Sequence, residues 1–376
     1  MPTLLPFRGL IADPSTAGAL IEGLAVGLDV LLSARALVRD DRPVLYRYIG
    51  SAQIGGRERE RRGFVALLPV DAPITVVAPP DEALGSATLA ASGVATALPV
   101  VTYDDPEGRG AECFERLESE PPRLDVTTVD GVRHRLWSLD DPAAQAWLLA
   151  PLMERRLHLV CGRAELEAQR AYGRASRARS PHPRAASDAT PVLVVAEQDP
   201  GLAVERPHLL VAPGIGCKAI EARISALGRE PFDVRENFYV TAREVERALH
   251  FGAGSVSFAV VAAPATRFFL LSLRRDTPVP GPQALKGDDA HVLAALLIER
   301  LGVPADALSP VRDLGSALEA VRQERASAAI LLNPISLGEA KKAVAAGHTL
   351  PGGPLSLRPA LPAALVAHRL DPDEPM

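Results

Sequence analysis

Several residue types are scarce in this chain of 376 residues, and each scarcity excludes something. Three cysteines are too few and too scattered for a disulfide framework or a C-x-x-C zinc pair, which fits a reducing cytoplasm. Lysine is rare, the basic residues being almost all arginine, and the net charge is −5. Without a clustered positive surface, nucleic acid and anionic membranes are not predicted partners.

Long apolar runs are also missing. Residues 17–32 are the most apolar stretch, but Glu22 and Asp29 interrupt them, so they are too short and too charged to span a bilayer. The composition, 47% hydrophobic and 23% charged with a mean hydropathy of +0.09, is that of a globular protein. The length suits two domains of ordinary size.

The first half of the chain mixes helical and strand patterns. Residues 15–39 have helical spacing after a possible cap at Asp13, and residues 124–129 and 132–139 flank Asp130-Gly131, which suits a two-residue hairpin turn. The charged segment 55–62 separates two of the predicted strands. Further strands are predicted at 44–49, 63–70, 98–103 and 157–161, and further helices at 142–155 and 164–179.

In the second half, strand and helix patterns alternate, which predicts an α/β arrangement. Strands are predicted at 192–196, 256–262, 268–274 and 328–332, and helices at 217–227, 242–251, 289–301 and 314–324. The predicted fold class is therefore α/β, with two subdomains that contain mixed sheets. Between them, residues 174–190 are rich in Arg and Pro and poor in apolar residues, so they predict an exposed linker between domains 1–173 and 191–376.

Residue patterns alone identify few candidate metal-binding, phosphate-binding or catalytic residues. None of the eight histidines forms the i, i+4 pairing that holds a metal on one helix face, so no metal site is predicted. The loop around Gly214, Gly216 and Lys218 lies between a strand and a helix, as a phosphate site would, but its spacing fits neither the Walker A pattern nor G-x-G-x-x-G and favours a structural turn. Cys161 stands between a strand and a helix, where it is either a small buried residue or a thiolate favoured by the helix dipole.

Several segments in the same order resemble the bacterial and archaeal family known as domain of unknown function 1015. Those in the first half are Pro6–Leu10, Asp40–Tyr48, Arg62–Phe64, Tyr103–Pro106 and His134–Trp137. In the second half, Leu331–Pro351 and a closing strand to Leu370 continue the series. The resemblance therefore runs along most of the chain.

Members of that family carry a D-G-H-H-R motif similar to the phosphate-binding box of the ParB, sulfiredoxin and free-serine-kinase group. The resemblance thus implies a ParB/sulfiredoxin-like first half and a nucleotide-handling phosphotransfer fold. Here the aligned residues are Cys161–Glu165, where Gly162 alone matches and Glu165 replaces an arginine. An acid at this position would repel phosphate.

Other polar positions of the family pattern depart as well, while the scaffold segments match. This contrast predicts a degenerate, non-catalytic member that acts as a binding, scaffold or regulatory protein in small-molecule metabolism. Its partner would be a small metabolite or another protein, and no cofactor is expected.

The alternative hypothesis is a nucleotide-dependent phosphotransferase that acts on a small serine-like metabolite and uses ATP or ADP with magnesium. In that case Arg8, Gly162 and Arg163 would bind the nucleotide. Glu165, His208 and Asp81 would be the candidates for catalytic roles. For each of these positions, an ordinary packing or surface role competes with the functional one.

Overall fold

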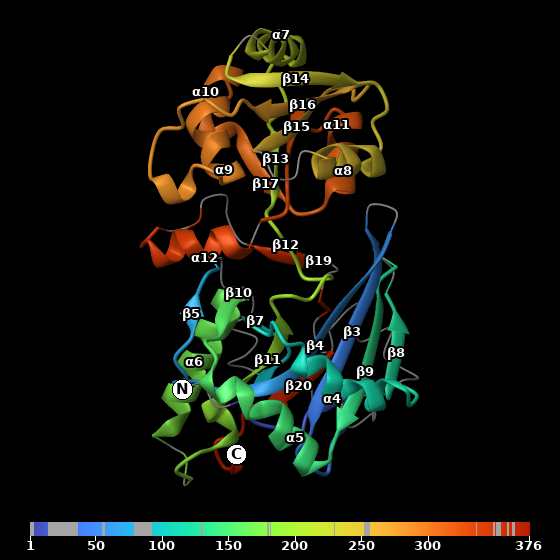
Figure 1. The fold of residues 1–376 in the computed structure, drawn as a ribbon, viewed down its shortest axis with the longest axis vertical. Coiled ribbons are helices and arrows are strands. Elements are labelled where there is room, and N and C mark those ends of the chain that lie inside the picture. The colour runs from blue at the N-terminus through green and yellow to red at the C-terminus, as the bar shows by residue number, and fades with distance from the viewer. Residues whose placement is uncertain are drawn as a thin grey trace. The chain divides into compact units, whose positions relative to one another are not determined.

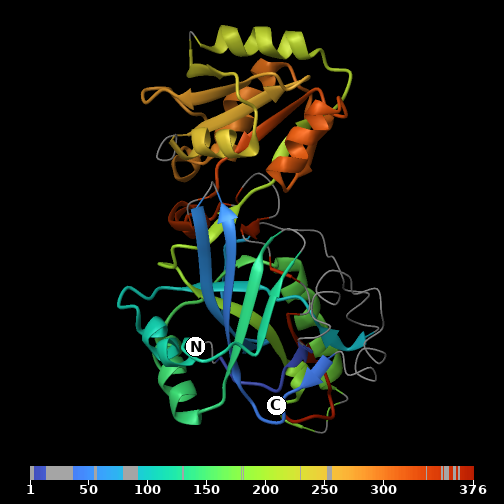
Figure 2. The same ribbon diagram turned by 90° about the vertical axis from the view of Figure 1, so that its right-hand side faces the viewer.

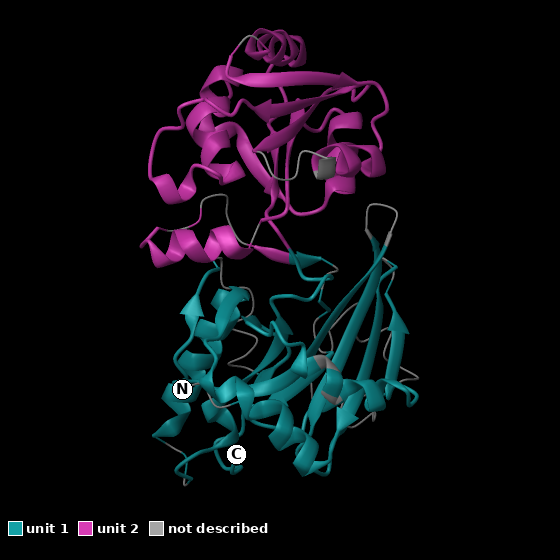
Figure 3. Cartoon of the chain, viewed as in Figure 1, with its two compact units in different colours: residues 1–203, 357–376 teal, residues 204–356 magenta. Residues whose placement is uncertain are grey.

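The computed structural model describes most of the chain and divides it into two compact units. Unit 1 comprises residues 1–203 and 357–376, and unit 2 comprises residues 204–356 (Figure 3). The described residues are 4–13, 37–54, 57–78, 92–128, 131–178, 180, 182–228, 230–251, 256–335, 337–348, 350, 355–358, 361–362 and 365–376.

Unit 1 is built on a mixed eight-stranded sheet with the order β5-β10-β7-β11-β4-β3-β9-β8 (Figure 1). The pairs β10–β5 and β11–β7 are parallel, and the other neighbours are antiparallel. In chain order the strands are β3 (Leu45–Ile54), β4 (Arg57–Pro69), β5 (Thr75–Val76), β7 (Val100–Tyr103), β8 (Leu124–Thr127), β9 (Arg133–Leu139), β10 (His158–Cys161) and β11 (Ala189–Ala196).

Helices cover one face of this sheet. Alternate residues of the central strands, such as Phe64 and Ala66 on β4 and Val192 and Val194 on β11, form a buried apolar cluster beneath them. The helices that contribute to this cluster are α4 (Arg109–Glu118), α5 (Pro142–Leu149), the 3-10 turn Pro151–Glu154 and α6 (Arg163–Arg177). Figure 1 shows α4 and α5 at this sheet.

The charged segment that was expected to separate two strands instead extends one of them. Arg57–Arg62 form the first half of β4 and pair with the end of β3 in a continuous antiparallel register, from Ile49 opposite Arg62 to Ile54 opposite Arg57. Glu58 and Arg62 of this half are exposed, whereas Arg61 is fully buried and donates to the Tyr48 hydroxyl at 3.3 Å. The backbone ladder is therefore longer than the apolar pattern.

The predicted hairpin forms, but its turn is one residue longer than expected. Thr127 pairs with Arg133, and the Thr128 N–H donates to the Val132 carbonyl, so three residues lie between the last paired positions. Gly131 has φ of 80°, the left-handed conformation that closes a three-residue loop. The Asp-Gly pair thus marks the hairpin correctly, although the two-residue turn was wrong.

Residues 174–190 are not an exposed linker, which corrects the predicted domain boundary. The C-terminal tail runs beside them: the Ala186 N–H donates to the Glu374 carbonyl and the Met376 N–H to the Arg184 carbonyl. Ala185 and Ser187 are fully buried. Backbone hydrogen bonds to the tail thus hold a segment that has few large apolar residues. The chain instead leaves unit 1 at β12 (Ala203–Glu205) and returns at β19 (Ser356–Arg358).

A small second sheet completes unit 1. Its order is β2-β1-β20-β6, and its strands are β1 (Leu10–Ala12), β2 (Leu37–Arg39), β6 (Val94–Ala95) and β20 (Val366–Arg369). The closing strand predicted up to Leu370 is therefore confirmed. Most of the predicted helix at 15–39 lies outside the described residues, and its last three residues are strand β2.

Unit 2 is a second α/β unit, with a six-stranded sheet of order β14-β16-β15-β18-β13-β17 (Figure 2). All its neighbouring strands are antiparallel. The strands are β13 (His208–Val211), β14 (Phe232–Asn237), β15 (Ser257–Ala262), β16 (Phe268–Leu273), β17 (Leu308–Val311) and β18 (Ala328–Leu332). The mixed α/β fold class is thus correct for the chain.

Both faces of this sheet are covered. Phe258 and Val260 on β15 point to one apolar cluster, whereas Ala259 and Val261 point to the other. The first face packs on α7 (Cys217–Leu227) and on the helical run of α9 (Asp289–Val292), a π-helical turn (Leu293–Leu297) and α10 (Ile298–Leu301). The second packs on α8 (Ala242–Phe251) and α11 (Leu314–Arg322). Helix α12 (Leu337–Ala345) and the 3-10 turns Ala186–Asp188, Gln283–Leu285 and Ala305–Ala307 complete the described elements.

Among the described residues, no helix combines the length and apolar character needed to cross a membrane.

Candidate functional site

A pocket of about 440 Å³ lies in unit 1, where β4, β7 and β11 reach the edge of the apolar cluster. Its walls come from the charged start of β4, the N-terminus of α4 and the loop that follows β11. The lining residues are Arg47, Glu58, Arg59, Glu60, Arg62, Gly63, Phe64, Tyr103, Asp105, Gly108, Gly110, Phe114, Val194, Ala196, Gln198, Asp199, Pro200 and Gly201. A hollow of this size matches a small organic molecule.

Aromatic residues form the inner part of the pocket. Phe64 on β4 and Phe114 on α4 lie with ring centroids 5.9 Å apart, and Tyr103 ends β7 on the same side of the sheet. The period of two along each strand puts these rings on the face that α4 covers. The pocket therefore begins where the apolar core stops.

Arg47 is buried beside these rings. Its guanidinium lies over the Phe114 ring at 4.4 Å, its Nε donates to Glu118 at 2.8 Å, and its Nη1 donates to the Gly63 carbonyl at 3.0 Å. Burial lowers the pKa of Arg47, and the charge of Glu118 works against this. Fixed by three contacts, Arg47 is part of the pocket's frame.

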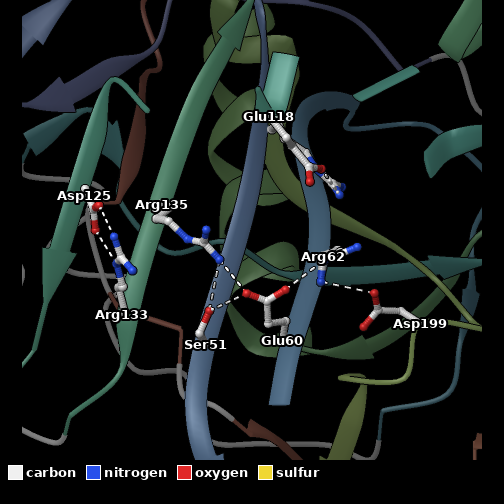
Figure 4. A network of polar contacts seen from close by, with 9 residues as sticks. Ser51, Glu60, Arg62, Glu118, Asp125, Arg133, Arg135 and Asp199 are labelled. Carbon is white, nitrogen blue, oxygen red and sulfur yellow. Dashed lines mark hydrogen bonds and ion pairs between the residues drawn. The ribbon is translucent and has the colours of Figure 1, made fainter. Parts of the chain in front are cut away.

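A polar network crosses the strands next to the pocket (Figure 4). Glu60 accepts from Arg62 at 2.7 Å, from Arg135 at 2.6 Å and from Ser51 at 3.2 Å. Burial alone would raise the pKa of Glu60, but the hydrogen bond from Arg62 and the nearby positive charges outweigh it and lower the pKa. Glu60 therefore stays ionised and aligns Arg62 at the pocket wall.

Two loops meet at the mouth of the pocket through Gln198. Its amide oxygen accepts from the Asp105 N–H at 2.8 Å, and its amide nitrogen donates to Asp104. Asp105 in turn accepts from the N–H groups of Arg109 and Gly110 at the start of α4, at 3.2 and 3.0 Å. These bonds tie the loop after β7 to the loop after β11.

Asp199 is the acid nearest the junction of these loops with β4. Its carboxylate accepts from the Gly201 N–H at 2.9 Å and from the Arg62 N–H at 3.2 Å (Figure 4). Burial raises the pKa of Asp199, although these bonds oppose the shift. Only glycine fits at position 201, because a Cβ there would lie 2.0 Å from the Glu60 carbonyl oxygen. The loop thus packs directly on β4.

This arrangement is suited to binding. It offers an aromatic floor, carboxylates with unused lone pairs and an arginine that is half exposed at the wall. Within the described part of the chain, no group of three or more His, Cys, Asp or Glu side chains is placed to hold a metal ion.

The predicted phosphate segment Cys161–Glu165 forms the strand, glycine and helix that the sequence indicates, at the start of α6. Gly162 has φ of 76° and caps the helix. Arg163 donates to Glu167 at 2.8 Å, and Glu165 is half-buried on the same helix. None of these residues is among those that line the pocket described above.

Replacing Gly162 with Ala is expected to destabilise unit 1 by about 1–3 kcal/mol, the cost of a left-handed conformation for a residue with a Cβ. The new Cβ would also lie 2.9 Å from the Pro99 Cα. Urea unfolding followed by tryptophan fluorescence measures this, since both tryptophans, Trp137 and Trp147, belong to unit 1. In the control Gly131→Ala, φ is also positive but no atom lies within 4 Å, so the loss should be smaller.

The other predicted site residues belong to other elements of the chain. Arg8 pairs with Glu374, which also accepts from Arg39 at 2.6 Å. His208 is a buried residue of unit 2, and its Nδ1 accepts from the Leu332 N–H at 3.2 Å. Asp81 lies outside the described residues. The functional roles assigned to these residues stay predictions.

Sequence reasoning did not single out the pocket residues Arg47, Arg62 and Asp199. A signal was present for two of them, because the segments Asp40–Tyr48, Arg62–Phe64 and Tyr103–Pro106 that carry the family resemblance all supply lining residues. By sequence alone, these segments indicate a scaffold role. For Asp199, which follows β11, the sequence offered no signal.

Comparisons with known proteins place the chain in a family and match several structures weakly. A conserved hypothetical protein from Pyrococcus furiosus is 13% identical, over 80% of this chain and 93% of that one, with a TM-score of 0.34. SbnI with a C-terminal truncation from Staphylococcus aureus is 11% identical, over 79% and 85%, with a TM-score of 0.37. Free serine kinase in complex with AMP is 11% identical, over 80% and 92%, with a TM-score of 0.34.

No curated protein matches the chain. The family model described as protein of unknown function (DUF1015) matches residues 12–263. Because this match covers more than half of the sequence, the chain belongs to the DUF1015 family.

Proposed function

We propose that this protein is a non-catalytic binding protein of small-molecule metabolism, and that its ligand is a small polar metabolite held in the pocket of unit 1. The observation that carries the proposal is the pocket itself: a hollow of about 440 Å³ with an aromatic floor and a ring of fixed polar groups. Sites for small molecules combine a mostly apolar concave surface with a few well-placed polar groups.

Preorganisation supports binding as the role of this pocket. Arg47 is fixed by Glu118 and Phe114, and Arg62 by Glu60. A ligand that meets groups already in place loses less free energy in ordering them. Because three separate chain segments form the rim, an occupied pocket would tie them together, which suits a regulatory or scaffold role.

The test is a thermal-shift screen of the full chain against amino acids, amines, organic acids, sugars and nucleotides. A ligand at about 100 times its Kd should stabilise unit 1 by roughly 2.7 kcal/mol. Ala196→Phe would fill the pocket and should abolish the shift, whereas Ala150→Phe, at an exposed position in unit 1, should not. The proposal fails if no compound shifts the transition, or if Ala196→Phe leaves the shift intact.

The alternative function is the nucleotide-dependent phosphotransferase. It is favoured by one observation, the left-handed Gly162 that opens α6 after a strand, since the N–H groups of a helix N-terminus can bind phosphate. Against it, the guanidinium of Arg163 already bonds to Glu167. A melting shift with ATP or ADP and magnesium that survives Ala196→Phe but is lost in Arg163→Ala would favour this alternative over the pocket.

A further inference from the structure

The arginines of the pocket are already neutralised by neighbouring acids. Arg47 contacts Glu118 at 2.6 Å, and Arg62 contacts Glu60 at 2.7 Å. Arg135 forms a second ion pair with Glu60, at 2.6 Å. An anionic ligand would have to compete with carboxylates that are held in place by the sheet. The paired guanidinium groups of these arginines are therefore poor binding partners for an anionic ligand.

Asp199 differs from the other acids in this network. Both of its described hydrogen bonds come from backbone N–H groups, those of Gly201 and Arg62, and no side-chain ion pair to it occurs among the described residues. Because a carboxylate has about four lone-pair positions, each oxygen can accept one further bond. Asp199 thus presents a carboxylate with spare lone-pair positions to the pocket, and the positive charges that act on it are those of Arg47 and Arg62, which already pair with glutamates.

Two further acids line the same hollow. Asp105 accepts from the N–H groups of Arg109 and Gly110 and from the Tyr103 hydroxyl, and Glu58 is exposed at the rim. The lining carries the four negative charges of Glu58, Glu60, Asp105 and Asp199 against the three positive charges of Arg47, Arg59 and Arg62, and the pairing partners Glu118 and Arg135 add one charge of each sign. The net charge around the pocket is therefore negative, which favours a cation.

The neutral residues of the pocket limit the polarity and the size of the rest of the ligand. The rings of Phe64, Tyr103 and Phe114 provide an apolar wall, and the volume limits the ligand to a small molecule. Burial raises the pKa of Asp199, and a positively charged group bound beside the carboxylate would lower this pKa again. Taken together, these features match a short organic amine.

We propose that the pocket binds a small molecule with a protonated amine, and that Asp199 accepts the hydrogen bond from this ammonium group. The inference rests on the proposed function, since it names the ligand class of the same pocket. It also sets the pocket apart from a phosphate site, for which an unpaired acid would be repulsive.

Three four-carbon probes of the same length test the inference by calorimetry on the full chain. We expect 1,4-diaminobutane to bind in the unit 1 pocket, and butane-1,4-diol and succinate to bind at least tenfold more weakly. Asp199→Asn should weaken the diamine at least tenfold, because it removes the charge. The control Glu154→Gln removes the charge of an exposed acid of unit 1 that does not line the pocket, and it should change the affinity less than threefold.

The probe comparison uses the unaltered protein, so it decides the question even if Asp199→Asn does not fold. Binding of succinate or inorganic phosphate in preference to the diamine, lost in Ala196→Phe, would overturn the amine assignment and leave the proposed function standing. Failure of the diamine to bind at millimolar concentration would also overturn the assignment. A different result overturns the proposed function: no compound in the thermal-shift screen produces a shift that Ala196→Phe abolishes.

Discussion

Replacing Arg206 with Met is expected to lower the free energy of unfolding of unit 2 by about 3–5 kcal/mol. Arg206 is almost fully buried and donates from Nη1 to Asp288 at 2.8 Å and from Nη2 to the other oxygen of the same carboxylate. Asp288 also caps α9, since it accepts from the His291 N–H at 2.8 Å. Without Arg206, a buried carboxylate loses its only described cation.

Hydrogen exchange of peptides from unit 2 measures this loss, because the protein's tryptophans both lie in unit 1. The double variant Arg206→Met with Asp288→Asn should regain part of the stability, since Asn removes the buried charge and can still cap the helix. A loss below about 1 kcal/mol in the single variant would show that the pair is not the buried ion pair described.

Acidification from pH 6.5 to 4 is expected to cost unit 1 about 3 kcal/mol through His368 alone. Burial lowers the pKa of His368 to about 4 from an ordinary value of 6.5. Its Nε2 donates to the Ala186 carbonyl at 2.8 Å, Phe7 packs edge-on against its ring, and Glu374 and Arg39 are the charged groups that act on it. Between these pH values the unfolded chain binds a proton that the folded chain does not, so stability is complete above pH 6.5 and falls as the pH drops.

The measurement is urea unfolding of unit 1 by tryptophan fluorescence at several pH values. His368→Gln keeps an N–H donor but does not titrate, so it should flatten the pH dependence in this window. His182→Gln is the matched control, because His182 also bonds to a backbone carbonyl, that of Asp373, but at an exposed position. An unchanged slope in His368→Gln would contradict the assignment.

Secondary structure follows from the sequence closely where apolar periodicity is strong. The helix predicted at 217–227 is α7, and the strand predicted at 328–332 is β18, because each buries a regular face against a neighbouring layer. Where a strand carries charge, as in the first half of β4, apolar periodicity gives no signal, since charged residues occupy even its buried position, Arg61.

The domain boundary was wrong for a related reason. Composition marks residues 174–190 as a linker, yet the segment is held by the tail, which lies almost two hundred residues further along the chain. Arg177 also bonds to Asp188, which is itself buried. Local composition cannot report that a distant segment satisfies these backbone and polar groups.

The residues of the pocket could not be predicted from local sequence either. Family resemblance brought attention to Arg47, Arg62 and Tyr103 as members of matching segments, but not to their convergence. Asp199 contacts β4 across 137 positions of sequence, and neither composition nor spacing links the two. Sequence reasoning looked for a phosphate motif and found Gly162, whereas the pocket lies elsewhere in unit 1.

By itself, the sequence determined the family, the mixed α/β class and the places of most helices and strands, because these depend on local periodicity and on runs of similar residues. Tertiary structure alone decided where the chain divides, which arginines are neutralised and which acid faces the pocket. Each of these depends on pairing between residues far apart in the chain, as for Arg8 with Glu374, 366 positions away. Ion pairs of this kind determine the charge that a binding site presents, whereas the sequence gives only the net charge of the whole chain.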